Sequence, residues 1–260
     1  MLRPRRRHVN CVWLALGNAG PGRYNPRHMT DARETISIAI ETTCRNGGVA
    51  LGRDGTLVAT LDFDAGGRAA THLITSLDEL LTRHDLTPRC LTEVYIAVGP
   101  GSFTGTRVGV TVARTLAQTV PGLRCVAVPT AQAVMLQAKT DLDNAAMVLD
   151  AGDGLAHITT FARQDGVFVQ SGDPVLGPAA EWLAGCPRPI YLIGEGLGYH
   201  DCTGPDITLA AESDWLPTPA SVWMAGQMLA LAGEFVDYHH LLPIYARPPK
   251  ALVAGERKNT

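Results

Sequence analysis

The chain has 260 residues, of which 46% are hydrophobic, and a formal net charge of −3 at pH 7. That length is enough for one large core or two smaller ones, because domains commonly run to roughly 100 to 150 residues. No apolar run approaches the roughly 18 residues of a membrane-spanning helix, and the six cysteines include no CxxC pair. We therefore expect a globular, cytoplasmic protein without a membrane anchor, a zinc motif or a redox motif.

The first 28 residues differ in charge from everything that follows. They contain six arginines and no acidic residue, so residues 29–260 carry a formal charge of 16 minus 25, or −9. An acidic body is poorly suited to bind a nucleic-acid backbone by itself, because phosphate contacts need clustered Lys and Arg. The basic head could be a nucleic-acid arm or a targeting segment. We favour a third interpretation, a disordered or wrongly assigned extension ahead of a start at Met29.

Residues 35–132 have the pattern of one α/β unit. Three short β-type runs, the last two joined by an Asp54-Gly55 turn, predict an antiparallel meander. An amphipathic helix, a buried strand, a second helix and a further strand then complete a parallel crossover. In chain order, we expect strands at 35–43, 47–51 and 56–63, a helix at 71–84, a strand at 94–98, a helix at roughly 104–119 and a strand at 125–128.

Residues 145–247 repeat much of that order, which predicts an internal duplication. The expected elements are strands at 145–152, 155–161 and 166–172, a short helix at 178–185, a strand at 190–196 and a last helix at roughly 220–236. We assign that last helix to the second half and treat residues 248–260 as a tail. In both halves an acidic residue ends the first strand: Glu41 in the first half and Asp150 in the second.

This architecture resembles the actin-like, ribonuclease H-like group of kinases and ATPases. The stretches "IAIETTCRNGGVAL", "YIAVGPGSFTGTRVGVTVA", "VLDAGDG" and "LPIYAR" narrow the resemblance to the TsaB family of tRNA threonylcarbamoyladenosine biosynthesis proteins, over nearly the whole chain after Met29. The resemblance implies a subunit without catalytic residues of its own, which forms a heterodimer with its paralogue TsaD. It also implies that the ATPase TsaE joins the pair and that tRNA is reached only through the complex.

The most specific motif is "GPGSFTGTR" at residues 99–107. Pro100 and Thr104 flank Ser102 where a nucleophile elbow needs glycines, and no Gly-Lys-Ser/Thr follows as in a Walker loop. A strand-to-helix turn of this kind could bind an anion through free backbone N–H groups. Alternatively, its glycines only let the helix pack closely, and we favour that alternative. If the cleft held a nucleotide or phosphate, the contacts would come from Glu41, Thr42, Thr43, Gly99, Gly101, Ser102, Thr104, Gly105 and Asp150.

Two rival functions remain open from the sequence. Glu41 and Asp150 could hold a Mg-nucleotide, which would make the chain an actin-like ATP-dependent small-molecule kinase or ATPase. The chain could also be a regulatory protein that forms homodimers. We expect no cofactor in this chain; ATP could instead be bound in the complex. We also expect no metal, because His72 is followed one helix turn later by Ser76 rather than by a second ligand.

The partner contact is expected on the helices at 71–84 and 104–119. In the second helix small residues recur every four positions, which lets another helix approach closely, and the family resemblance places TsaD on both helices. The alternative is that both helices only cover their own sheet. The residues predicted to form the interface are Leu77, Leu81, Gly109, Val110, Ala113 and Ala117.

Overall fold

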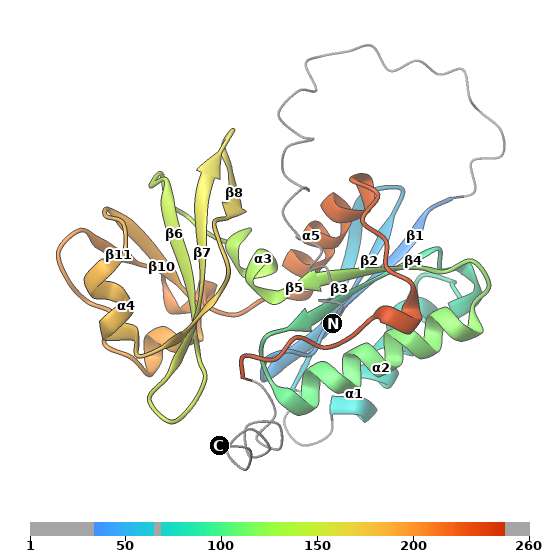
Figure 1. Cartoon of the computed structure of the whole chain (residues 1–260). Coiled ribbons are helices and arrows are strands. Elements are labelled where there is room, and N and C mark those ends of the chain that lie inside the picture. The colour runs from blue at the N-terminus through green and yellow to red at the C-terminus, as the bar shows by residue number, and fades with distance from the viewer. Residues whose placement is uncertain (1–33, 65–68, 248–260) are drawn as a thin grey trace, which may run out of the picture.

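The computed structural model describes residues 34–64 and 69–247, which form two α/β lobes (Figure 1). The expectations for the basic head at 1–28 and for the tail at 248–260 concern residues that lie outside the described ones. None of the described helices is long and apolar enough to cross a membrane.

The first lobe is built on a five-stranded sheet with the order β3-β2-β1-β4-β5. Its strands are β1 (Ile36–Glu41), β2 (Asn46–Arg53), β3 (Thr56–Asp64), β4 (Glu93–Gly99) and β5 (Arg124–Pro129). β1 pairs antiparallel with β2 and parallel with β4. Both β1 and β4 are buried along their whole length, as expected of central strands with helices on both faces.

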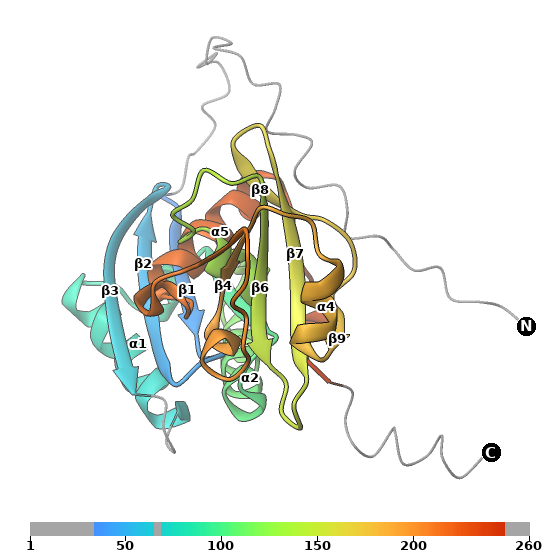
Figure 2. The ribbon, with the colours of Figure 1, turned by 90° about the vertical axis from the view of Figure 1, so that its left-hand side faces the viewer.

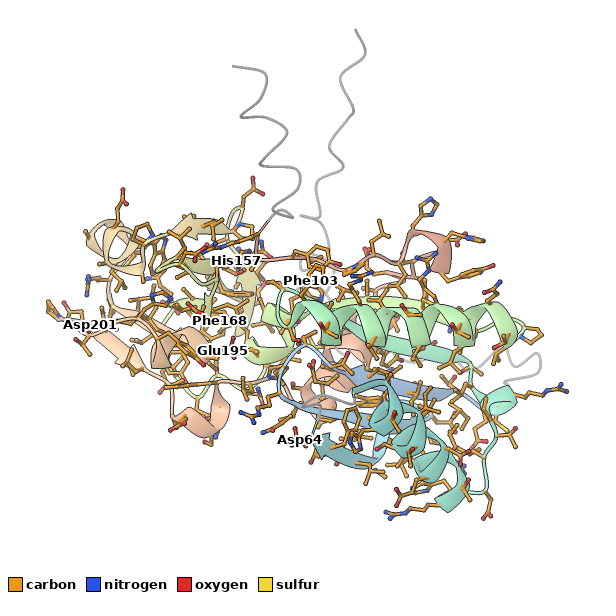
Figure 3. The ribbon with its side chains drawn as sticks, turned by 90° about the horizontal axis from the view of Figure 1, so that it is seen from below. Asp64, Phe103, His157, Phe168, Glu195 and Asp201 are labelled. Atoms are coloured by element: carbon orange, nitrogen blue, oxygen red, sulfur yellow. The ribbon has the colours of Figure 1, made fainter. Side chains whose placement is uncertain are left out.

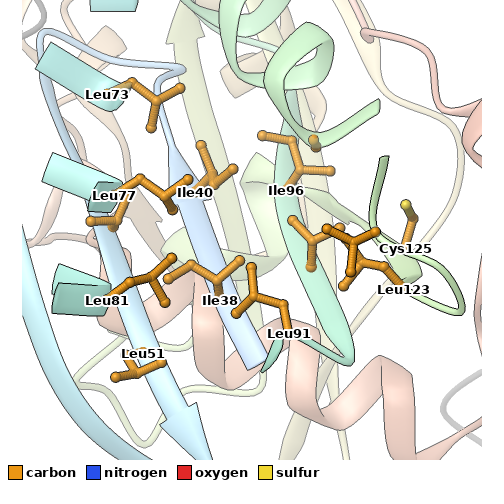
Figure 4. Packing of buried hydrophobic residues seen from close by; sticks show 14 of the residues in the cluster. Ile38, Ile40, Leu51, Leu73, Leu77, Leu81, Leu91, Ile96, Leu123 and Cys125 are labelled. Atoms are coloured by element: carbon orange, nitrogen blue, oxygen red, sulfur yellow. The ribbon is translucent and has the colours of Figure 1, made fainter. Parts of the chain in front are cut away.

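One face of this sheet is covered by α1 (Ala69–Arg83) and α2 (Phe103–Thr119). Leu73, Leu77 and Leu81 of α1 point onto Ile38 and Ile40 of β1, and together they form part of one apolar core (Figure 4). A 3-10 helix at Pro88–Cys90 leads from α1 into β4. The predicted strands and helices of this half are therefore present, with ends shifted by at most two residues.

The second lobe repeats the strand order of the first. Its sheet reads β11-β10-β6-β7-β8, with β9 paired to β7, which is the order of the first sheet read from the opposite edge. Its elements are β6 (Asn144–Asp150), β7 (Ala156–Gln164), β8 (Val167–Gln170), β9 (Val175–Gly177), α4 (Ala179–Gly185), β10 (Ile190–Ile193) and β11 (Ile207–Leu209). Figure 2 shows α4 packed beside β7. Where the first lobe has α2, this lobe has only a short 3-10 helix at Glu195–Gly198.

The last long helix, α5 (Pro219–Leu231), packs on the first lobe and not on the second. The Trp223 indole N–H donates to the Ser37 hydroxyl at 2.9 Å, and a Cβ on Gly52 would overlap the indole ring. The assignment of this helix to the second half is corrected accordingly. It also ends earlier than predicted, because Gly233 takes a left-handed backbone (φ 78°) that stops the helix.

Three features connect the lobes: a short helix, an ion pair and a C-terminal segment. The short helix α3 (Thr130–Met135) supplies apolar residues to cores in both lobes, while Lys139 and Asp214 form an ion pair (Nζ to Oδ2, 2.9 Å) that links the two chain segments running between the lobes. Residues 234–247 form a C-terminal strap, which includes a 3-10 helix at Tyr238–His240. The strap runs past β4, where the Ile244 N–H donates to the Val98 carbonyl at 2.6 Å. The strap ends on the second lobe, where Arg247 pairs with Asp153 (Nη1 to Oδ2, 2.6 Å) and bonds the Gly152 carbonyl.

Candidate functional site

The glycine-rich loop between β4 and α2 lies directly against the end of β1. The Ser102 N–H donates to the Thr43 carbonyl at 2.6 Å. A Cβ added to Gly101 would overlap the Thr43 carbonyl oxygen, and a Cβ added to Gly105 would overlap that of Thr42. The glycines therefore make room for the chain's own backbone at residues 42 and 43.

Three N–H groups at the start of α2, those of Ser102, Gly105 and Thr106, are engaged within the protein. Ser102 caps α2, its hydroxyl accepting from the Gly105 N–H at 3.2 Å, while its carbonyl accepts from the Thr106 N–H at 2.9 Å. Gly99 has a left-handed backbone (φ 99°), and the Ile244 carbonyl of the strap lies where its Cβ would be. This geometry agrees with the close-packing interpretation and gives no support to a phosphate cradle.

Glu41 is fully buried at the end of β1. Its Oε1 accepts from the Thr43 hydroxyl at 2.7 Å and from the Thr43 backbone N–H. Its Oε2 and the Thr42 hydroxyl are buried and have no hydrogen-bond partner among the described residues. Burial raises the pKa of the Glu41 carboxyl to about 7, against the lowering effect of the Thr43 bonds. The carboxyl thus caps its own turn in a dry environment.

Asp150 ends β6 in the second lobe and is partly exposed. Its Oδ1 lies 3.1 Å from His200 Nε2. The pKa of Glu195 is raised mainly by burial of that carboxyl, and the negative charge of Asp150 adds to the rise. Figure 3 shows Glu195 on the side of the second lobe that faces the first. Burial raises the pKa of the Cys44 thiol in the first lobe, and the charges of Glu41 and Glu195 add to the rise.

Each of the two strand-end acids has its partner in its own lobe: Thr43 for Glu41 and His200 for Asp150. Sequence reasoning did not find Glu195 or His200, because only the fold brings them near Asp150. Within residues 34–64 and 69–247, no group of three or more His, Cys, Asp or Glu side chains could hold a metal ion.

Comparisons with known proteins agree with the motifs. The family model described as "TsaD: tRNA N6-adenosine threonylcarbamoyltransferase" matches residues 65–183. The chain is also 25% identical over 222 residues to the tRNA threonylcarbamoyladenosine biosynthesis protein TsaB of Bacillus subtilis (strain 168), covering 82% of this chain and 95% of that protein. The chain is thus similar to a TsaB protein over most of its length.

Solved structures share its fold. YeaZ from Pseudomonas aeruginosa is 20% identical, with a TM-score of 0.69 over 81% of this chain and all of that one. A second structure, an uncharacterized protein with similarity to peptidase YEAZ from the same organism, is 22% identical, with a TM-score of 0.69 over 82% of this chain. Together with the repeated strand order, these matches confirm the predicted duplicated, actin-like α/β fold.

The residues predicted to contact a partner are mostly in the core of the first lobe. Leu77, Leu81, Val110 and Ala113 are buried in the cluster between the helices and the sheet, and Ala117 packs against it. A Cβ on Gly109 would overlap the Thr42 hydroxyl. The small-residue ridge of α2 therefore packs mainly on the helix's own sheet, which leaves the buried members of the predicted set no surface for a partner. A partner contact at Ala117, which is partly exposed, stays a prediction.

A different set of residues forms the outer face of α1 and α2. Ile74 and Phe103 are about half exposed (52% and 53%), and the Arg107 guanidinium lies over the Phe103 ring, 5.2 Å from its centroid. Along α2, Val108, Val112 and Leu116 are partly exposed at a spacing of four residues. This face has the mixture of apolar side chains and arginine that is enriched at protein interfaces.

Proposed function

We propose that the chain is a non-catalytic subunit of the cytoplasmic machinery that forms threonylcarbamoyladenosine in tRNA, and that it acts as a heterodimer with TsaD, joined by the ATPase TsaE. The name of the Bacillus subtilis relative supports the pathway, and the match to the TsaD family model supports common ancestry with the transferase. One structural observation favours a subunit over a kinase or ATPase. The loop that would have to bind phosphate is packed against the backbone of residues 42 and 43.

The outer face of α1 and α2 is the surface that we assign to TsaD. Val108, Val112 and Leu116 form a row that is only partly covered by the chain itself, with Arg107 and Thr111 exposed beside it. α2 carries two arginines and no acidic residue. Such a face fits a partner helix with apolar and acidic side chains, and two helices from each chain would then form a four-helix interface.

Co-purification with TsaD tests this assignment. The change Ile74→Glu, or Arg107→Glu, should abolish retention by tagged TsaD, because each places a carboxylate in the apolar contact. Each variant should keep the wild-type circular dichroism spectrum, since both side chains are exposed in the isolated chain. Val175→Glu is the matched control, because Val175 is 42% exposed but lies in the second lobe.

Three outcomes contradict parts of the proposal. If both variants bind TsaD normally, the interface does not lie on these two helices. Failure of the wild-type chain to bind TsaD would reject the heterodimer itself. Formation of the modified nucleoside by TsaD and TsaE without this chain would reject its role in the pathway.

A further inference from the structure

Helix α5 has an unusual composition for a helix at the surface of a lobe. Its thirteen residues, "PASVWMAGQMLAL", include no charged side chain. Val222, Trp223 and Leu229 are buried against the first sheet, but the opposite side is apolar as well. Met224 is 41% exposed and Leu231 77% exposed.

The exposed side forms a continuous apolar row. Ala220, Met224, Met228 and Leu231 lie on one side of the helix at spacings of four, four and three residues, and we call these four residues the α5 stripe. Surface helices normally carry polar residues on their outer face, and a helix that is apolar all round is normally covered on both sides. The first sheet and α3 pack against α5, but among the described residues they leave Met224 and Leu231 exposed, so the stripe is a candidate docking surface.

The chain enters the described structure beside this helix. Thr35 exchanges two hydrogen bonds with Asp54: its N–H donates to the Asp54 carboxylate at 2.9 Å, and its carbonyl accepts from the Asp54 N–H at 2.8 Å. Gly55, in the same turn, lies next to the Gln227 side chain of α5. The 33 residues that precede Glu34 are therefore attached close to the C-terminal half of the stripe.

Those 33 residues contain an apolar run of suitable size and a complementary charge. Residues 11–16 read "CVWLAL", and residues 1–33 contain seven arginines and one aspartate, a formal charge of +6. The remainder of the chain carries −9, and Asp54 and Glu234 are exposed near the C-terminal end of α5. Opposite charges of this kind favour association and set its orientation.

We propose that residues 11–16 dock on the α5 stripe of the same chain. The distance poses no obstacle, since the 18 peptide units between Leu16 and Glu34 could extend to about 60 Å, whereas the stripe is about 16 Å long. Docking would bury the Trp13 ring against Met224 and Met228, and a sulfur–aromatic contact of that kind is favourable. On this proposal the basic head is part of the folded protein, contrary to the expectation from its composition.

Hydrogen exchange of the full chain, followed by mass spectrometry, tests the proposal. Amides of residues 11–16 should exchange at least about tenfold more slowly in the wild-type protein than in Met224→Glu, because exchange follows the population of the open state. The matched control is Leu242→Glu, an equal change at a 60% exposed residue of the C-terminal strap, which should leave that protection unchanged. Trp13→Glu perturbs the head alone and should abolish the protection with no effect on the fold.

Two results would overturn the proposal. One is free exchange of residues 11–16 in the wild-type protein, or protection that neither Met224→Glu nor Trp13→Glu removes. The other is a dimer, seen by sedimentation, that persists in the chain starting at Met29 and dissociates in Met224→Glu. In that case a second copy of the chain covers the stripe. Neither measurement involves TsaD, so the outcome is independent of the proposed heterodimer.

Discussion

Glu41→Gln should make the free energy of unfolding less dependent on pH. The Glu41 carboxyl is fully buried, and its pKa in the folded protein is about 7, against an ordinary value of 4.5. The folded state therefore binds more protons than the unfolded state between pH 4.5 and pH 7, and stability decreases as the pH rises through that window. A difference of about 2.5 pKa units corresponds to roughly 3 kcal/mol at pH 7 and above.

The variant isolates this contribution, because glutamine is neutral at every pH. Its carbonyl can still accept the two Thr43 donors, whereas its NH₂ group would lie near the position of Oε2, which has no hydrogen-bond partner in the part of the chain that the structure describes. That unsatisfied group costs about 1 to 3 kcal/mol, but the cost is the same at every pH. The stability of the variant relative to wild type should therefore increase by about 3 kcal/mol between pH 4.5 and pH 8.

Urea unfolding followed by tryptophan fluorescence, at several pH values across this range, measures the difference. Asp173→Asn, at an exposed carboxylate, serves as the control and should show no comparable trend. A constant difference between Glu41→Gln and wild type would mean that the carboxyl is hydrated. A difference of the opposite sign would mean that a cation pairs with it, which would revive the nucleotide-binding interpretation.

Two further changes test the packing of the loop and the strap. Gly105→Ala should lower the free energy of unfolding by roughly 1 to 3 kcal/mol or more, because the new methyl group would overlap the Thr42 carbonyl. The control is Gly177→Ala, which has no atom within 4 Å of its Cβ and should change the free energy of unfolding by about 0.5 kcal/mol or less. Equal effects of the two changes in thermal unfolding would contradict the close packing at Gly105. Arg247→Ala should lower stability by about 1 kcal/mol through the lost bond to Gly152 and should speed hydrogen exchange at Leu155, whose N–H is bonded to that carbonyl. Unchanged exchange there would show that the strap does not support the second lobe.

The fold was predictable where the sequence pattern is local. β1 and β4 are largely continuous apolar runs because both of their faces are covered by helices. α1 has a single apolar stripe because only one of its faces is covered. The placement of α5 was not predictable in this way. Its attachment to the first sheet depends on the fit of Trp223 over Gly52 and of Gly226 over Tyr95, pairs separated by more than 130 positions in the chain. A periodic pattern identifies the apolar face of a helix but not the sheet that the face meets.

The small residues of α2 illustrate the same limit at the site. Glycine or alanine at every fourth position correctly indicates that something approaches the helix closely. In the structure the approaching groups are Thr42 and Ile96 of the first lobe, so the ridge serves the core, and the surface left for a partner is the adjoining row of valines and Leu116. The burial of these small residues distinguishes packing in the core from contact with a partner, whereas their spacing in the sequence is the same in both cases.

The glycines of the loop at residues 99–105 pose a comparable choice, because a phosphate cradle and a closely packed turn need the same residue type. The two differ in where the backbone N–H groups point. In a cradle they converge on an empty position, whereas here those of Ser102, Gly105 and Thr106 are bonded to Thr43 and to Ser102 itself. The loop thus fixes the start of α2 against the end of β1, and the residues at that start, Phe103 and Arg107, belong to the face assigned to TsaD. A loop built in this way supports a binding surface by holding α2 at a fixed position, which is the contribution expected of a subunit that supplies a surface.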